Sequence, residues 1–405
     1  MLRDYLTRHS FLLSVTCLSL VLVFSLLMLN RSFAIGAIVG ILFLLFTHQK
    51  IRLSKVAMIL SVFAVIALTL FLSIYIESDS SLGRLLIYKV SAKMFLEHPF
   101  SGIGWGAFQK EYNLHQALFF KSGNYTQKEF LLADNTFYAF NDYWQFIVEM
   151  GIIGGLCLLM SLLLIIALIR TRLKNNANDP FLKLLVAIAL MVCVAAFFTH
   201  VFEHKPFQVV MLCMLAYMIL YDRIKRLRPQ IRACALTAIP VVLSLAIYLN
   251  EIRNIDNYQK LEQAKLLSAT GYVNESISIL EKLYPTLRDD VGFLKTYSET
   301  LSGRSMTRRK TSLLREILAQ YSDNSTFLKL GLAYKELGRF KQAEAAFLQS
   351  VYMVPNRFVP REALYQFYLR NKQYEQASYW RKIILTMSVK IPSERIEAIK
   401  QTMNQ

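Results

Sequence analysis

Long apolar runs are the feature that most limits how this chain can fold. They lie at about 11–29, 33–47, 54–76, 143–169, 181–199, 206–221 and 233–249. A helix needs roughly 20 apolar residues to cross the hydrocarbon core of a bilayer, and several of these runs reach that length. The shorter ones would cross thinner bilayer or rely on neighbouring helices. The pattern predicts an all-α, polytopic membrane helix bundle with about seven spans.

The distribution of charge predicts which loops face the cytoplasm. The formal net charge is +18, and the basic residues collect in short loops between apolar runs, around 50–55, 170–174 and 223–232. Cytoplasmic loops carry an excess of Lys and Arg, so these clusters are expected inside. A cytoplasmic N-terminus satisfies all of them and places the loop 77–141 and everything after 250 outside. Because topology explains the charge, nucleic-acid binding is not expected.

The cysteines give no sign of a disulfide framework or a metal site. All of them lie inside apolar runs, where small apolar residues are common, and none has the Cys/His spacing of a metal site. They are Cys17, Cys157, Cys193, Cys213 and Cys234.

The polar C-terminal region, 250–405, repeats. Residues 324–357 match the spacing of a tetratricopeptide repeat, whose period is about 34 residues. The matching positions are Phe327, Leu330, Gly331, Tyr334, Ala343, Phe347 and Pro355. We therefore predict a transmembrane domain over 1–249 and an α-solenoid of tetratricopeptide-like helix pairs over 250–405. Such arrays usually bind a protein or a polymer in a concave groove, although this one could simply stabilise its neighbour.

Two arginines on the outer side of the membrane are candidates for binding phosphate. Arg31 follows the first apolar run in LNRSFA, and Arg84 lies in SLGR within the outer loop. A guanidinium holds a phosphate with two hydrogen bonds and keeps its charge. The alternative is structural, with the arginine snorkelling to the membrane surface.

The segment EHPFSGIGWGAF, residues 97–108, alternates glycine with larger residues. A dinucleotide-binding Gly-x-Gly run requires a preceding strand and a following helix in a βαβ unit, which is not predicted here. The segment also lies outside, away from cytoplasmic nucleotides. Its glycines are expected to permit tight turns and close backbone approach.

Short motifs within about residues 25–155 combine into a pattern. They are Asn30-Arg31-Ser32, Gly83-Arg84, His98-Pro99-Phe100-Ser101-Gly102-Ile103-Gly104, Asn141-Asp142-Tyr143-Trp144-Gln145 and Glu149-Met150-Gly151-Ile152-Ile153-Gly154. The combination resembles the O-antigen ligase/polymerase superfamily, some of whose members also carry a C-terminal tetratricopeptide region.

The resemblance implies an inverting glycosyltransferase on the periplasmic face of a bacterial inner membrane. In that family the donor is a glycan on undecaprenyl diphosphate, and the acceptor is another glycan, a lipid A–core or a protein hydroxyl. Such enzymes use no nucleotide sugar, and neither a metal nor another cofactor is expected. Membrane lipids, and a protein bound by the repeats, would be further partners.

The resemblance also assigns roles to residues. Arg31 and Arg84 would hold the diphosphate and stabilise charge on the leaving group, and Asn141 and Asp142 would complete the catalytic set. The residues expected to bind substrate or shape its cavity are His98, Gly102, Gly104, Trp105, Tyr143, Gln145 and Glu149. For His98 and Glu149 the alternatives are a surface polar residue and an interfacial pair, and an aromatic belt at the membrane interface would explain the aromatic residues.

The sequence departs from the family pattern in two ways. Many ligases have a His before the Asn, where this chain has Phe140. Asp142 could act as the base instead, although nearby arginines would lower its pKa. Alternatively, His200 or His204 could supply the imidazole. The family also usually has more spans, so an N-terminal portion could be missing.

Two other classes of function remain open. One is a non-catalytic membrane scaffold whose outer repeats recruit partners of an envelope assembly. The other is a transporter, which the lack of mid-span charges disfavours. Among glycan transferases, the repeats outside the membrane favour a polymerase or a transferase with a large acceptor over a ligase.

Overall fold

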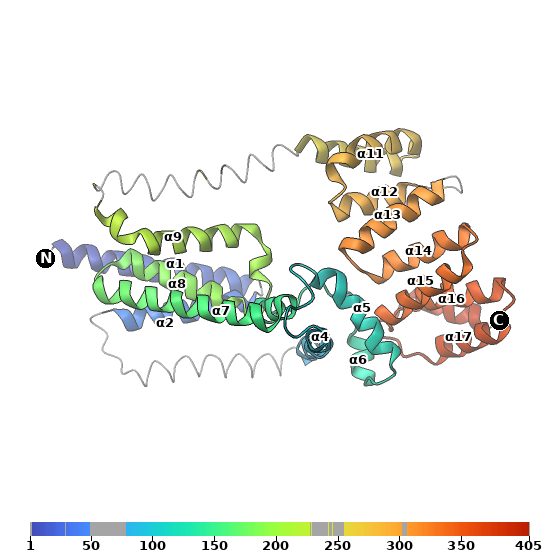
Figure 1. Ribbon diagram of the computed structural model, residues 1–405, viewed down its shortest axis with the longest axis horizontal. Coiled ribbons are helices and arrows are strands. Elements are labelled where there is room, and N and C mark those ends of the chain that lie inside the picture. Colours follow the sequence, from blue (N-terminus) through green and yellow to red (C-terminus); the bar gives the residue numbers. More distant parts are fainter. Residues whose placement is uncertain are drawn as a thin grey trace. The chain divides into compact units, whose positions relative to one another are not determined.

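The computed structural model describes residues 2–28, 30–48, 78–226, 228, 242, 245, 255–301 and 306–404, with the backbone alone for 2–10 and 78. Every regular element in these ranges is a helix, which confirms the all-α class for the described residues (Figure 1). The predicted apolar runs at 54–76 and 233–249 lie outside them, except for positions 242 and 245.

The helices form two compact units. The first comprises Met1–Ser81, Pro99–Gly102 and Tyr138–Leu249, and the second comprises Leu82–His98, Ile103–Phe137 and Asn250–Gln405. Most of the predicted outer loop therefore belongs to the same unit as the C-terminal helices. The sequence pattern did not predict this association.

The first unit is built around a close contact between α2 (Arg31–Thr47) and α8 (Pro180–Ala195), with α1 (Leu2–Leu27) packed on α2. A Cβ on Gly36 would lie 2.3 Å from the carbonyl oxygen of Met191, and one on Gly40 would lie 3.0 Å from a carbonyl of α8. Small residues four positions apart let membrane helices approach closely. The buried side chains are Leu18, Ala37, Leu44, Ala187, Met191, Val192, Ala195, Ala196 and Val201.

The other helices of the first unit are α7 (Asp142–Asn175), the short 3-10 helix η1 (Val201–Glu203) and α9 (Lys205–Arg226). Among the described helices, α7 and α9 are long and apolar enough to cross a membrane, and shorter apolar helices cover Phe11–Leu27, Arg31–Thr47 and Pro180–Ala195. The full count of seven spans remains a prediction.

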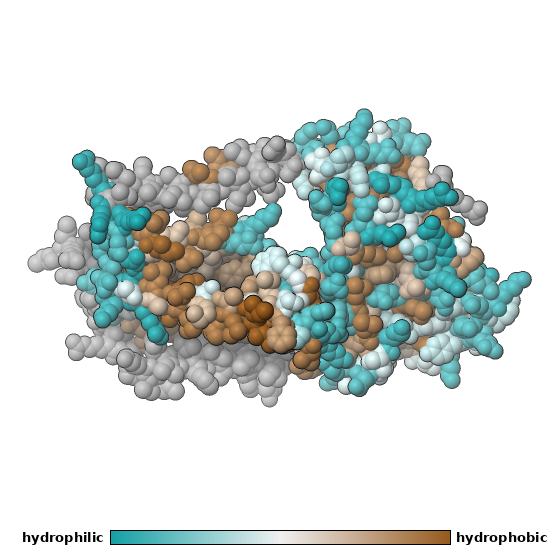
Figure 2. Space-filling view, in the orientation of Figure 1, coloured by the Kyte–Doolittle hydropathy of each residue, from teal (hydrophilic) through white to brown (hydrophobic). Residues whose placement is uncertain are grey.

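The outer surface of α7 is hydrophobic (Figure 2). Its large apolar side chains are at least 52% exposed at Ile153, Leu156, Leu159, Met160, Leu163 and Leu164. An apolar surface of this extent marks contact with lipid or with another protein. With the apolar helices beside it, it is the surface of an integral membrane protein.

The second unit contains most of α4 (Ser78–Glu97), together with α5, α6 and the C-terminal helices. Their bounds are α5 (Phe108–Lys121), α6 (Gln127–Leu132), α11 (Val273–Leu287), α12 (Val291–Thr300), α13 (Thr307–Gln320), α14 (Asn324–Glu336), α15 (Phe340–Met353), α16 (Phe358–Arg370), α17 (Tyr374–Thr386) and α18 (Glu394–Asn404). From α11 to α18, each helix packs on the next along the chain.

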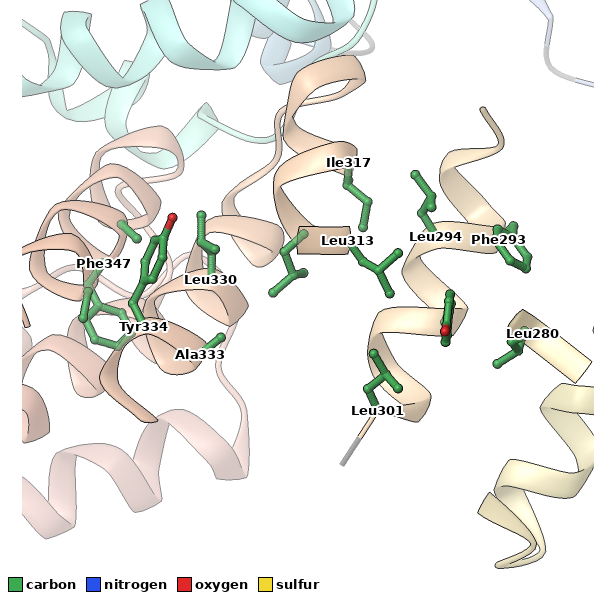
Figure 3. Packing of buried hydrophobic residues seen from close by; sticks show 14 of the residues in the cluster. Leu280, Phe293, Leu294, Leu301, Leu313, Ile317, Leu330, Ala333, Tyr334 and Phe347 are labelled. Carbon is green, nitrogen blue, oxygen red and sulfur yellow. The ribbon is translucent and has the colours of Figure 1, made fainter. Parts of the chain in front are cut away.

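One continuous apolar core joins helices α11 to α17 (Figure 3). The repeat-like residues 324–357 form α14 and α15, where a Cβ on Gly331 would lie 2.6 Å from the ring of Phe347. Only glycine lets that fully buried ring pack so closely, and Ala343 is also fully buried. These small residues have the packing role that the repeat spacing predicts, while the solenoid as a whole remains a prediction.

Buried amides fix α5 to the C-terminal helices. Asn113 is fully buried, and its Nδ2 donates to the carbonyl of Ser322 at 2.7 Å. Gln116 is 1% exposed, and its Nε2 donates to the carbonyl of Met353 at 2.6 Å. A buried amide without a partner is costly, so these bonds favour a single docked position for α5.

A second set of amides binds the end of α6 and the residues that follow it, 130–135. Asn356 is 8% exposed, and its Nδ2 donates to the carbonyls of Phe130, Leu131 and Ala133 at 2.7–3.1 Å. Nearby, the side chains of Asn135 and Asn324 are hydrogen-bonded at 2.8 Å. The C-terminal helices therefore shape the outer loop directly.

Replacing Asn356 with Ala should release this stretch. The change leaves buried carbonyl groups unpaired, at roughly 1–3 kcal/mol for each group that water does not reach. We expect lower thermal stability of the full-length protein in detergent and faster proteolysis within 130–137. Gln342→Ala, which removes an exposed amide on α15, is the matched control. Equal proteolysis of the two variants would contradict the assigned role of Asn356.

Candidate functional site

The start of α7 is where several predicted site residues meet. Asn141 caps the helix, with its Oδ1 accepting from the backbone N–H of Trp144 at 3.0 Å. The backbone N–H of Asp142 donates to the carbonyl of Ala196 at 2.9 Å, and its Oδ2 accepts from the N–H of Phe202 at 3.0 Å. These contacts tie α7 to the end of α8 and to η1.

Gln145 connects three parts of the first unit through one buried amide. Its Oε1 accepts from the backbone N–H of Ala139 at 3.0 Å, and its Nε2 donates to Glu203 Oε1 at 2.7 Å. The same Nε2 lies 3.4 Å from Glu149 Oε1, and both Gln145 and Glu149 are 4% exposed. The Gln145 amide thus links the segment before α7, at Ala139, to α7 itself and to η1.

The glycine-rich segment inserts into a break in α7. Gly151 has φ +66°, so the helix is interrupted there, and the N–H of Ile152 donates to the carbonyl of Pro99 at 2.8 Å. A Cβ on Gly102, which has φ +69°, would lie 2.2 Å from the carbonyl oxygen of Glu149. A side chain at Gly102 or at Gly151 would collide with the backbone of the other segment. Glycine is needed at both positions because the two backbones approach so closely.

Tyr143 points into the helix bundle. Its hydroxyl donates to the carbonyl of Cys193 at 2.9 Å, and its ring centroid lies 4.3 Å from that of Phe197. The hydroxyl is engaged by α8, so Tyr143 contributes to the packing of α7 against that helix.

His200 contacts two aromatic rings. Its imidazole stacks on Tyr138 with centroids 4.2 Å apart and planes 4° apart, and Phe140 meets it edge-on at 5.7 Å. Phe140 has φ +53°, a left-handed conformation that costs a bulky residue about 1–2 kcal/mol. Burial and the neighbouring His204 lower the pKa of His200, which favours its neutral form.

Arg31 lies at the same end of the first unit as this turn. It is the exposed first residue of α2, two positions before Phe33, whose ring is 5.3 Å from that of Phe207. The ring of His204 is 6.5 Å from the same Phe207. One end of the unit therefore carries a guanidinium, carboxylates and imidazoles.

The remaining predicted site residues belong to the second unit, apart from Gly102. Arg84 is half-buried on α4, and His98 is exposed just after this helix. Gly104 has φ +107°, and Trp105 is 73% exposed. Their assignment to the substrate site remains a prediction.

Sequence reasoning did not include Glu203 among the site residues, and it offered His200 only as an alternative. The signal was the turn THVFEHK, in which two histidines flank a glutamate between apolar helices. Its significance depends on Gln145 and Tyr138, which lie about 60 residues earlier and contact it only in the fold. Within the described residues, no group of three or more His, Cys, Asp or Glu side chains could hold a metal ion.

The chain was compared with known proteins. Residues 14–159 match the family model described as O-antigen ligase. This stretch includes Arg31, Arg84 and the first turns of α7, and the match confirms the resemblance there. No curated protein matches the chain.

Removing the Asp142 carboxylate should loosen the turn that carries His200. Asp142→Ala deletes the acceptor for the N–H of Phe202, whereas Asp142→Asn retains a side-chain oxygen there. A hydrogen bond to a charged group contributes roughly 1.5–3 kcal/mol. Hydrogen exchange at Phe202 should therefore accelerate about tenfold or more in the Ala variant and much less in the Asn variant. Unchanged exchange in both would show that the carboxylate does not hold the turn.

Proposed function

We propose that this protein transfers or polymerises surface glycan from an undecaprenyl-diphosphate donor to a glycan, lipid A–core or protein acceptor. The proposal rests on the family match of residues 14–159 together with the polar site that the same residues form at the start of α7. Residues 14–159 match the O-antigen ligase family, and within the stretch the polar residues at the start of α7 form an ordered hydrogen-bonded site.

The family match supports an inverting transfer as the reaction. An acceptor hydroxyl oxygen attacks the anomeric carbon of the donor from the face opposite the diphosphate. The new glycosidic bond forms as the bond from that carbon to the phosphate oxygen breaks, so the configuration inverts, and the proton lost from the hydroxyl is taken up by the released diphosphate. Arg31 and Arg84 pair with the phosphate oxygens and stabilise the charge that develops on the leaving group. Two guanidinium groups supply this stabilisation without a metal.

The other residues shape the acceptor side. Asp142 and Gln145 order the turn through the hydrogen bonds described above, and Glu149 lies beneath Gln145. Asn141 fixes the direction of α7 as its cap. In this proposal His98, Gly104 and Trp105 contact the glycan from the outer loop.

The membrane arrangement completes the proposal. About seven spans hold the chain in a bacterial inner membrane, with the N-terminus in the cytoplasm. The transmembrane domain is 1–249, and residues 250–405 form a periplasmic tetratricopeptide-like solenoid. The buried amides of Asn113, Gln116 and Asn356 support a role for that solenoid in shaping the outer loop.

Arg31→Ala and Arg84→Ala test the proposal. Each removes a group that neutralises the leaving diphosphate, so we expect roughly a 100-fold or greater loss of glycan transfer. Lys variants should recover only part of the activity, because an ammonium lacks the bidentate fork. The readout is surface glycan on cells in which each variant replaces the natural protein at matched abundance.

Arg170→Ala, which changes a predicted cytoplasmic arginine, is the matched control and should leave glycan unchanged. Deletion of 255–404 distinguishes the scaffold alternative. If both outer arginine variants retain normal glycan while the deletion abolishes it, the protein is a scaffold and the transferase proposal is wrong.

A further inference from the structure

One of the aromatic residues that contact His200, Phe140, has a strained backbone conformation. Tyr138 stacks on the imidazole, Phe140 contacts it in a T-shaped arrangement, and Phe140 has a positive φ. Strained backbone of this kind persists where neighbouring contacts fix it, and it often marks a functional site. The hydrogen bond from Ala139, between these two residues, to Gln145 is one such contact.

The two nitrogens of His200 have different surroundings. Nδ1 is buried and has no hydrogen-bond partner in the part of the chain that the structure describes. A buried N–H without an acceptor is rarer than a buried bare acceptor, so the proton belongs on Nε2. Protonating the ring would place an N–H at Nδ1 as well, and therefore the imidazole stays neutral. The lowered pKa of His200 agrees with this arrangement.

The titratable groups near His200 are the phenol of Tyr138, which stacks on it before α7 begins, and groups on α7 and on the turn itself. From α7, Asp142 accepts from the backbone of η1, and Glu149 lies beside Gln145. From the turn itself, Glu203 is engaged by Gln145, and His204 lies with its ring 5.5 Å from that of His200. The carboxylates of Asp142 and Glu203 thus accept from backbone and amide donors, and within the described residues His200 has no hydrogen bond to a carboxylate.

We propose that His200 binds the acceptor, donating its Nε2–H to an acceptor oxygen next to the hydroxyl that reacts. This inference rests on the glycan-transfer function proposed above. A neutral donor suits an uncharged sugar or alcohol oxygen, whereas a diphosphate would favour the protonated ring and is matched by the arginines. His200 orients the acceptor and takes no proton from it.

The charge state can be measured without any substrate. In full-length protein labelled with ¹⁵N-histidine and reconstituted in nanodiscs, NMR should show His200 neutral at pH 7 with its proton on Nε2. Assignment uses the His200→Phe variant, in which this signal is absent. A ring protonated at pH 7, or one with the proton on Nδ1, would overturn the proposal.

Transfer assays test the contact itself. His200→Phe retains an aromatic ring for Tyr138 but lacks the N–H, and the rate of surface-glycan transfer should fall roughly 2- to 10-fold, the range for one hydrogen bond. His200→Gln retains a donor near the Nε2 position and should lose less than about twofold. A base could not be replaced by Gln, so an equal loss in both variants would contradict the donor role.

The matched control is His48→Phe. His48 follows the other end of α2, and its ring contacts that of Phe11 with centroids 4.0 Å apart. This variant makes the same chemical change away from the site and should keep full activity. Arg31→Ala in the same assay separates the two proposals. Loss of transfer in Arg31→Ala with a normal rate in His200→Phe would refute the role of His200 and leave the transferase intact.

Discussion

The amide of Gln145 is the contact on which the candidate site depends. It is buried, and it accepts from the segment that leads into α7 while donating toward Glu149 and Glu203. Few side chains can do both, because the task needs an acceptor and a two-proton donor on one rigid group. A glutamate here would bring a further carboxylate next to the others, and a leucine would leave them without their donor. The positions of Phe140, Asp142 and His200 all follow from this junction.

In the second unit, buried side-chain amides likewise hold the outer loop in place. A segment that crosses a surface has backbone groups to satisfy, and here Asn356 satisfies carbonyls at the end of α6 and just after it. Asn113 and Gln116 do the same on α5, so the loop is held by directional bonds as well as by apolar packing. The C-terminal helices therefore help to determine the shape of a loop that carries predicted site residues.

The sequence predicts the local features well and the long-range ones poorly. Apolar runs predict helices, and Asn141 before an apolar stretch predicts a helix start, because both signals lie within a few turns of chain. The short motifs that contain Arg31 and Arg84 indicate the family for the same reason, because each is local in the sequence. Asn113 and Ser322 are 209 positions apart, and no spacing rule connects them. His200 was an alternative in the sequence and becomes prominent only because the fold places Tyr138 and the strained Phe140 against it.

The central claim is that the chain consumes a lipid-linked glycan, and the pool of undecaprenyl-diphosphate-linked glycan in a deletion strain tests it most directly. The account predicts that this pool rises and returns to normal when the full-length protein is restored. Single repeat units would accumulate if the protein is a polymerase, and long unattached chains if it is a ligase. A pool of unchanged size and chain length in the deletion strain would contradict the account.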